Sequence, residues 1–199
     1  MKQRLIKHIE SITDPALRGA CRALLDYDKF FTWPASLGFH HAYEGGLLAH
    51  TVEVCDIALG IEQISDGTRE GNPFDRESSF DILIASALWH DFCKVREYYR
   101  IGGPGRHDSI DQECQPVEWK HTDYGKHVYH ISGSAIEFTI AARNWKVSDS
   151  VIDAVTHCIL AHHGRREWGS PVEPQTLEAL ILHQADMLSA KFGATKDRP

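Results

Sequence analysis

The stretch from Leu47 to Ile64, LLAHTVEVCDIALGIEQI, decides the fold class of this chain. One face of the stretch is apolar at helical spacing, which predicts a long amphipathic helix with the inner residues Leu47, Val54, Ile57 and Ile61. His50 lies on the same stripe, so we expect the helix to point an imidazole into its own core face. A long helix of this kind needs helical partners to cover its apolar side.

Helical patterns outnumber strand patterns in the rest of the chain. The capping sequence Thr13-Asp14-Pro15 predicts a helix through residue 27, and further helices are expected at 80–95, 127–144, 148–162 and 175–191. A polar loop is expected at 65–76. The segment 98–126 is rich in glycine and has no helical period, and we expect a short hairpin that pairs 97–101 with 117–120. The sequence therefore predicts an all-α helical bundle with a short β-hairpin excursion around residues 97–120.

Length and composition limit the class of protein. The 199 residues, 42% of them hydrophobic, favour one domain over 1–199. No apolar run approaches the roughly 18 residues that span a bilayer, and the N-terminal MKQRLIKHIE has no apolar signal segment, so we expect neither a membrane helix nor a secretory signal. The 5 cysteines form no CxxC pair, which argues against a disulfide scaffold or thiolate zinc site and favours the reducing cytoplasm.

Charge and histidine content point in different directions. The formal net charge of −7 argues against a protein that coats itself with nucleic acid. The 13 histidines are unusual for a chain of this size, and imidazole is the commonest metal ligand.

Several histidines and carboxylates fall on helix faces that should point inward. His90 follows the apolar stripe of one helix, and Asp91 follows the adjoining stripe. His162 and Asp186 lie among apolar residues of two later helices. The ordinary explanation for any one buried histidine is a hydrogen bond to a backbone carbonyl. A set of inward histidines beside buried carboxylates instead favours a metal site, and nitrogen and oxygen ligands without thiolate favour a catalytic one.

The sequence around these residues resembles a known family, the HD-domain metal-dependent phosphohydrolases. The resemblance is closest to a subgroup that includes bacterial 3′-5′ exoribonucleases and HD domains found with conjugative relaxases. It rests on blocks that occur in the family's order: HHAYEGGLLAHT at 40–51, ALWHDFCK at 87–94, TDYGK at 122–126 followed by His130-Ile131, HHG at 162–164, EWGSP at 167–171, and TLEALILH at 176–183 with Asp186. The similar region runs from about residue 12 to residue 192, nearly the whole chain.

The resemblance implies a site with two divalent metal ions, which the sequence does not identify among Mn, Fe, Ni, Co, Zn and Mg. The implied ligands of the first ion are His50, His90, Asp91 and Asp186, and those of the second are His130, His162 and His163, with Asp91 bridging the two. A metal-bound hydroxide would attack the phosphorus atom. The resemblance also implies that Asp91 and Lys94 are catalytic, with Lys94 as a cation for the phosphate. We expect His41, Arg165 and Arg166 to contact substrate.

The expected substrate is a phosphomonoester or phosphodiester of a nucleotide or short oligonucleotide. Two alternatives remain: a 3′-5′ exoribonuclease-type nuclease acting on a short single strand, and a non-catalytic regulatory module that binds metal. The chain departs from the family in that Cys93 replaces the usual small residue between the HD doublet and the lysine, which leaves a redox-regulated variant open. The OB-type nucleic-acid-binding domain of the exoribonucleases is not expected here, because the HD region begins close to residue 1.

Overall fold

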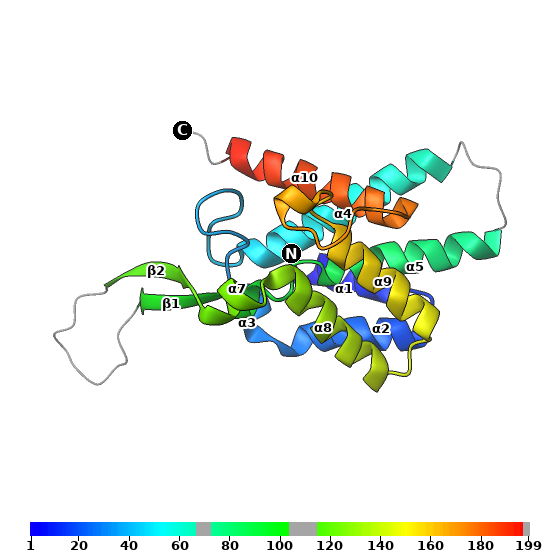
Figure 1. The fold of residues 1–199 in the computed structure, drawn as a ribbon, viewed down its shortest axis with the longest axis horizontal. Helices are drawn as coiled ribbons and strands as arrows, with labels where there is room; N and C mark the ends of the chain where they lie inside the picture. Colours follow the sequence, from blue (N-terminus) through cyan, green and yellow to red (C-terminus); the bar gives the residue numbers. More distant parts are fainter. Residues whose placement is uncertain (67–72, 104–114, 197–199) are drawn as a thin grey trace.

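The computed structural model describes residues 1–66, 73–103 and 115–196. Most of the described chain is helical, which confirms the predicted all-α class (Figure 1). The predicted loop at 65–76 was wrong at both of its described ends, because residues 65–66 and 73–76 are helical, and its centre lies outside the described residues. The centre of the predicted excursion also lies outside the described residues. The helices are α1 (Lys2–Ser11), α2 (Pro15–Arg22), α3 (Asp28–Thr32), α4 (Gly46–Asp66), α5 (Pro73–Trp89), α6 (Lys94–Glu97), α7 (Asp123–His127), α8 (His130–Asn144), α9 (Asp149–Ala161) and α10 (Leu177–Lys196), with 3-10 turns η1 (Ala23–Asp26) and η2 (Arg166–Trp168).

Helix α5 lies at the centre of the bundle. It packs against α2, α4, α9 and α10, and α4 and α10 also pack against each other. The predicted inner stripe of α4 is on the core side, with Leu47 and Val54 fully buried and Ile57 and Ile61 partly buried. No described helix has both the length and the apolar character that a membrane crossing requires.

The start of α2 is fixed by the predicted cap. The Asp14 carboxylate accepts hydrogen bonds from the backbone N–H groups of Ala16 and Leu17, and Pro15 occupies the first turn. The buried carboxylate of Asp81 in α5 accepts from the backbone N–H groups of Thr13 and Asp14. The cap therefore also ties the N-terminal helices to α5.

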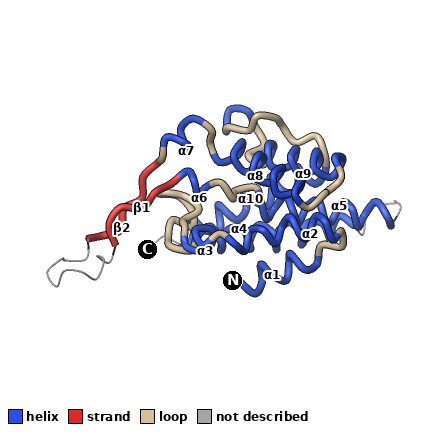
Figure 2. The backbone as a smooth tube through the Cα atoms, turned by 90° about the horizontal axis from the view of Figure 1, so that it is seen from below, coloured by secondary structure: helices blue, strands red, loops and turns tan. Residues whose placement is uncertain are grey.

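The expected hairpin is present. Strand β1 (Tyr98–Gly103) pairs antiparallel with β2 (Gln115–His121), with Tyr98 opposite His121 and an irregularity between Ile101 and Gly103. Figure 2 shows the hairpin projecting from one end of the helical body. Its base is held by Trp33, whose indole N–H donates to the Tyr98 carbonyl over 3.1 Å.

Several predicted helix boundaries were wrong, among them the start of α5, which lies at Pro73 instead of residue 80. The helix expected at 80–95 ends at Trp89, and residues 90–93 form a tight turn in which the N–H of Phe92 donates to the Trp89 carbonyl and that of Lys94 to the Asp91 carbonyl. The helix expected at 127–144 begins at His130, because Tyr129 has a φ of 64° that no continuous helix accommodates. The sequence pattern also gave no indication of α1.

Candidate metal centre

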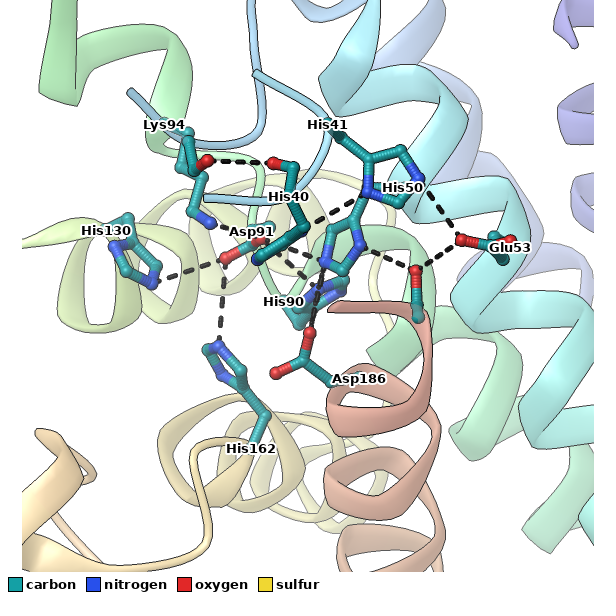
Figure 3. A network of polar contacts seen from close by, with 12 residues as sticks. His40, His41, His50, Glu53, His90, Asp91, Lys94, His130, His162 and Asp186 are labelled. Atoms are coloured by element: carbon teal, nitrogen blue, oxygen red, sulfur yellow. Dashed lines mark hydrogen bonds and ion pairs between the residues drawn. The ribbon is translucent and has the colours of Figure 1, made fainter. Parts of the chain in front are cut away.

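Six of the seven residues predicted as metal ligands converge around the turn after α5 (Figure 3). His50 comes from α4, the doublet His90-Asp91 from the turn, and Asp186 from α10. His130 is the first residue of α8, and His162 directly follows α9. Segments far apart in sequence thus place these side chains in one buried cluster.

The two carboxylate oxygens of Asp91 face different groups of histidines. Oδ2 lies 3.3 Å from Nε2 of His50 and 3.5 Å from Nε2 of His90. Oδ1 lies 3.3 Å from Nε2 of His130 and 3.7 Å from Nε2 of His162. Asp91 therefore stands between two sets of nitrogen atoms, which is the arrangement that a bridging carboxylate requires.

Each side of Asp91 carries a compact group of donor atoms. On one side, Asp186 Oδ1 lies 3.1 Å from Nε2 of His50 and 3.9 Å from Nε2 of His90. On the other side, donor atoms of His130, His162 and His163 all lie within 4.8 Å of one another. The seventh predicted ligand, His163, therefore joins the second group, so the structure brings the full predicted set together.

Hydrogen bonds fix which nitrogen of each histidine carries a proton. Nδ1 of His90 and of His162 donates to the carbonyl oxygen one helical turn earlier, over 2.9 and 2.7 Å. Nδ1 of His163 donates to the Trp168 carbonyl over 2.8 Å. Nδ1 of His50 donates to Ser189 Oγ, whose own hydroxyl donates to Glu53. A neutral ring with its proton on Nδ1 presents a lone pair on Nε2, the form that binds a metal ion.

Several buried atoms in the cluster lack a partner that would satisfy them. Asp91 Oδ1 and Nε2 of both His130 and His162 are buried and make no hydrogen bond within the described chain. Nε2 of His50 lies 3.3 Å from Nε2 of His90, so two lone pairs face each other when both rings carry their proton on Nδ1. Buried polar atoms are almost always paired, and a cation between these atoms would satisfy them all. The residues therefore fit a divalent metal ion.

The electrostatics of the cluster favour the charge states that metal ligands need. Burial alone would raise the pKa of Asp91, but Lys94 and the neighbouring histidines hold that pKa well below its usual range. Burial lowers the pKa values of His130 and His162 well below the usual range, which keeps both rings neutral. The ammonium group of Lys94 lies 2.7 Å from Asp91 Oδ2, as expected for a residue one turn from His90.

Sequence reasoning missed Glu97, which orients one of these histidines. Nδ1 of His130 donates to Glu97 Oε2 over 2.7 Å, and the His121 ring lies 3.6 Å from the other carboxylate oxygen. Burial raises the pKa of Glu97 to about 7. Glu97 is the last residue of α6, and no local sequence pattern marked it, because its partner His130 comes from α8.

The predicted substrate residues take different positions. His41 is buried behind the cluster, and its Nε2 lies 3.2 Å from Glu53 Oε2. Arg165 and Arg166 are exposed, and Arg165 stacks on Trp168 at 5.0 Å. Neither arginine lines the cavity that opens beside the cluster. His40, which was not predicted, does line that cavity.

A cavity of about 630 Å³ opens beside the cluster. Its walls come from the segment before α4, from α6, the base of the hairpin, the residues that precede α8, and α10; they comprise Ser36, Leu37, Phe39, His40, Lys94, Glu97, Tyr98, His121, Tyr129, His130, His163, Met187, Ala190 and Lys191. Tyr129 has φ 64° and ψ 153°, a region that is otherwise almost restricted to glycine. Strained residues of this kind concentrate at functional sites.

Cys93 is fully buried next to the site. Its Sγ lies 3.8 Å from the hydroxyl of Tyr124, and burial raises the pKa of the thiol to about 12. A buried thiol that stays protonated is a poor nucleophile. The position therefore argues against the redox-regulated variant that the sequence left open.

Comparison with known proteins decides the family. The family described as HD domain matches residues 47–191 of the chain. The chain belongs to the HD-domain family. It is also 31% identical over 194 residues, 96% of its length, to a protein from Geobacillus sp. (strain WCH70) named 3′-5′ exoribonuclease YhaM, and 30% identical over the same span to the protein of that name from Bacillus subtilis (strain 168). No solved structure matches the chain.

The HD-domain assignment confirms the predicted family, the all-α fold and the class of metal-dependent phosphohydrolases. HD domains bind divalent metal ions, and the His and Asp groups of this chain have the donor atoms for such ions. The matched segments cover 52% and 54% of the two relatives, so the chain spans about half of their length.

Proposed function

We propose that this HD domain hydrolyses a phosphate ester of a nucleotide or short oligonucleotide at a centre with two divalent ions. One ion would be held by His50, His90, Asp91 and Asp186, and the other by His130, His162 and His163, with Asp91 bridging. The observation that carries the proposal is the division of the Asp91 oxygens between two groups of histidine nitrogen atoms. A centre that only stabilised the fold would not need an open cavity beside it.

The residues of the chain prepare this centre for the reaction. Divalent ions, when bound, lower the pKa of a coordinated water and neutralise charge on the phosphate oxygens. The ionised Asp91 and the neutral rings of His130 and His162 supply ligands that need no deprotonation at pH 7. The buried ammonium group of Lys94 faces both Asp91 and the cavity, where it attracts the substrate phosphate and stabilises charge that develops on its oxygens.

A second candidate, 3′-5′ exoribonuclease activity, is favoured by the printed name of the relatives. The net charge of −7 opposes extended contact with a nucleic-acid strand, so we place this activity second. A single strand labelled at its 3′ end separates the two: a processive or distributive exonuclease releases the labelled nucleotide, whereas a nucleotidase leaves the strand intact.

The test of the proposed function is turnover by the purified chain loaded in turn with Mn²⁺, Fe²⁺, Co²⁺, Ni²⁺, Zn²⁺ and Mg²⁺. Bis(4-nitrophenyl) phosphate, nucleoside monophosphates and short oligonucleotides form the substrate panel. We expect release of product with at least one ion and its loss in Asp91→Asn, while the control Asp153→Asn, which alters an exposed carboxylate of α9, retains activity. A metal-loaded wild type that hydrolyses none of these substrates contradicts the proposal and favours a regulatory module.

We also propose the cytoplasm as the compartment of this protein. The four cysteines that the structure describes are all free and buried, as expected in a reducing environment. Proteins of oxidising compartments would more often pair such residues in disulfides.

A further inference from the structure

The cavity beside the metal centre changes in character from its floor to its rim. At the floor, Lys94 and His130 are buried, with 7% and 3% of their surface exposed. At the rim, Phe39 and Tyr129 are 83% and 37% exposed, and Lys191 is also exposed. A ligand that reaches from the metal centre to solvent therefore meets a cationic floor, an aromatic wall and then a second cation.

Lys191 adds a second cation to the lining of the cavity. Within the part of the chain that the structure describes, its ammonium group takes part in no ion pair and no cation–π contact. It lies on α10 at four residues from Met187, and both line the cavity, so the two side chains share one face of that helix. Lys191 also lies five residues beyond Asp186, about 7.5 Å along the helix axis. Its Cα is thus displaced along α10 from that of Asp186, so its ammonium group would meet a part of the ligand other than the reacting phosphate.

The aromatic wall suits the base or sugar between two phosphates. Exposed aromatic rings stack on nucleic-acid bases without strong sequence preference. Phe39 and Tyr129 offer such rings at the rim, and the buried Tyr98 also lines the cavity. Glu97, the one carboxylate among the described lining residues, accepts a hydrogen bond from His130 and faces His121. The remaining charge of the described lining is positive, although the chain as a whole is acidic.

We propose that this cavity selects substrates that carry a second phosphate, one nucleoside away from the reacting phosphate, and that Lys191 binds that second phosphate. This inference rests on the proposed function and adds the substrate class: the end of an oligonucleotide or a nucleoside bisphosphate, in preference to a nucleoside with one phosphate. An exposed lysine contributes charge and hydrogen bonds without a rigid geometry, so it recognises either form of the second phosphate.

Two matched substrate pairs test the proposal. ApA and pApA share one phosphodiester and differ only in the terminal phosphate, and 3′-AMP and pAp form the corresponding pair of phosphomonoesters. Whichever pair the metal-loaded wild type hydrolyses, we expect kcat/KM to be at least tenfold higher for the member with the additional phosphate, pApA or pAp. The pair that shows this preference distinguishes an oligonucleotide end from a nucleoside bisphosphate.

Variants assign the preference to Lys191. Lys191→Ala should reduce the preference to about twofold or less without changing kcat for the member with one phosphate, Lys191→Glu should reverse it, and Lys191→Arg should retain it. Lys7→Ala, which removes an exposed lysine of α1 that does not line the cavity, controls for the overall charge and should leave the preference intact.

The outcomes separate this inference from the proposed function. Turnover of bis(4-nitrophenyl) phosphate with equal kcat/KM for both members of each pair, or a preference that survives Lys191→Ala, overturns the inference and leaves the function standing. If no substrate is hydrolysed, calorimetry on the same pairs carries the test: a second phosphate that does not tighten binding through Lys191 refutes the inference by itself.

Discussion

Nδ1 of His130 lies 2.7 Å from Oε2 of Glu97, and both side chains are buried with 3% of their surface exposed. The carboxylate accepts a hydrogen bond from the ring N–H, which leaves Nε2 facing Asp91 Oδ1 at a distance of 3.3 Å. A carboxylate behind a histidine ligand fixes the ring's orientation and raises its basicity. Glu97 would therefore support the proposed metal centre by orienting one of its ligands, without itself contacting an ion.

Replacement of Glu97 should weaken the metal centre more than the fold. We expect Glu97→Ala to lower metal affinity or kcat by roughly 10- to 100-fold, the range for such partners. Glu97→Gln should lose less metal affinity, because its amide oxygen can still accept the hydrogen bond from the His130 ring. Calorimetric metal titration and circular dichroism check both points, with Glu118→Ala on the exposed face of β2 as control. Unchanged metal affinity in Glu97→Ala would show that another group orients His130.

Divalent ions should stabilise the folded protein. A ligand present at 100 times its Kd adds about 2.7 kcal/mol to the free energy of unfolding, which corresponds to a rise in Tm of roughly 5–10 °C for a chain of this length. Thermal denaturation with EDTA and then with Mn²⁺ measures the shift. The Asp186→Asn variant should show a smaller shift, because it removes a carboxylate that lies 3.1 Å from His50 Nε2. Equal Tm values with and without every ion tested would argue against a metal centre.

The metal-free protein should lose stability as pH falls below about 6.5. Burial lowers the pKa of His40 to about 3 and holds those of His130 and His162 well below their usual range. Below about pH 6.5 these rings therefore bind protons in the unfolded state but not in the folded state, which favours unfolding. His50 acts in the opposite direction: burial lowers its pKa, but Asp186 and Asp91 outweigh burial and raise it, so its contribution is lost as pH rises. Glu97 acts in the same direction as His50, because burial raises its pKa to about 7. The three lowered histidines outnumber these two raised groups.

Thermal denaturation in EDTA between pH 7.5 and 5.5 tests this expectation. We expect a lower Tm at pH 5.5, with a smaller fall in His40→Asn than in the wild type. His127→Asn changes an exposed ring and should leave the pH dependence as it is. A Tm that rises toward pH 5.5 would show that the raised groups, His50 and Glu97, dominate.

Cys93 should prove inert to oxidation. Its buried thiol has a pKa raised to about 12, so almost no thiolate forms near neutral pH. Cys93→Ala should keep kcat within about twofold, and hydrogen peroxide should affect wild type and variant alike. Turnover before and after peroxide, with and without reductant, provides the measurement. If peroxide inactivated the wild type but not Cys93→Ala, the hypothesis of regulation through oxidation of Cys93 would be supported.

The sequence predicted those parts of the site that depend on helix periodicity. The inward positions of His50 and Asp186 follow from their places on apolar stripes, and the family blocks added His130 and His163. Glu97 was missed because its role depends on α6 approaching α8, a tertiary contact that no local pattern records. The turn at 90–93 was also missed, since apolar spacing continues through it while the backbone hydrogen bonds change from i−4 to i−3.

At Tyr129, the stability of the fold and the choice of substrate make opposite demands on the residue. A residue held at φ 64° and ψ 153° costs the folded state about 1–3 kcal/mol, which glycine would largely recover. Glycine would also remove the ring from the cavity wall, where a base would stack. Laboratory evolution for heat resistance alone is thus expected to erode substrate choice at this position, and a screen that rewards both properties would keep the tyrosine.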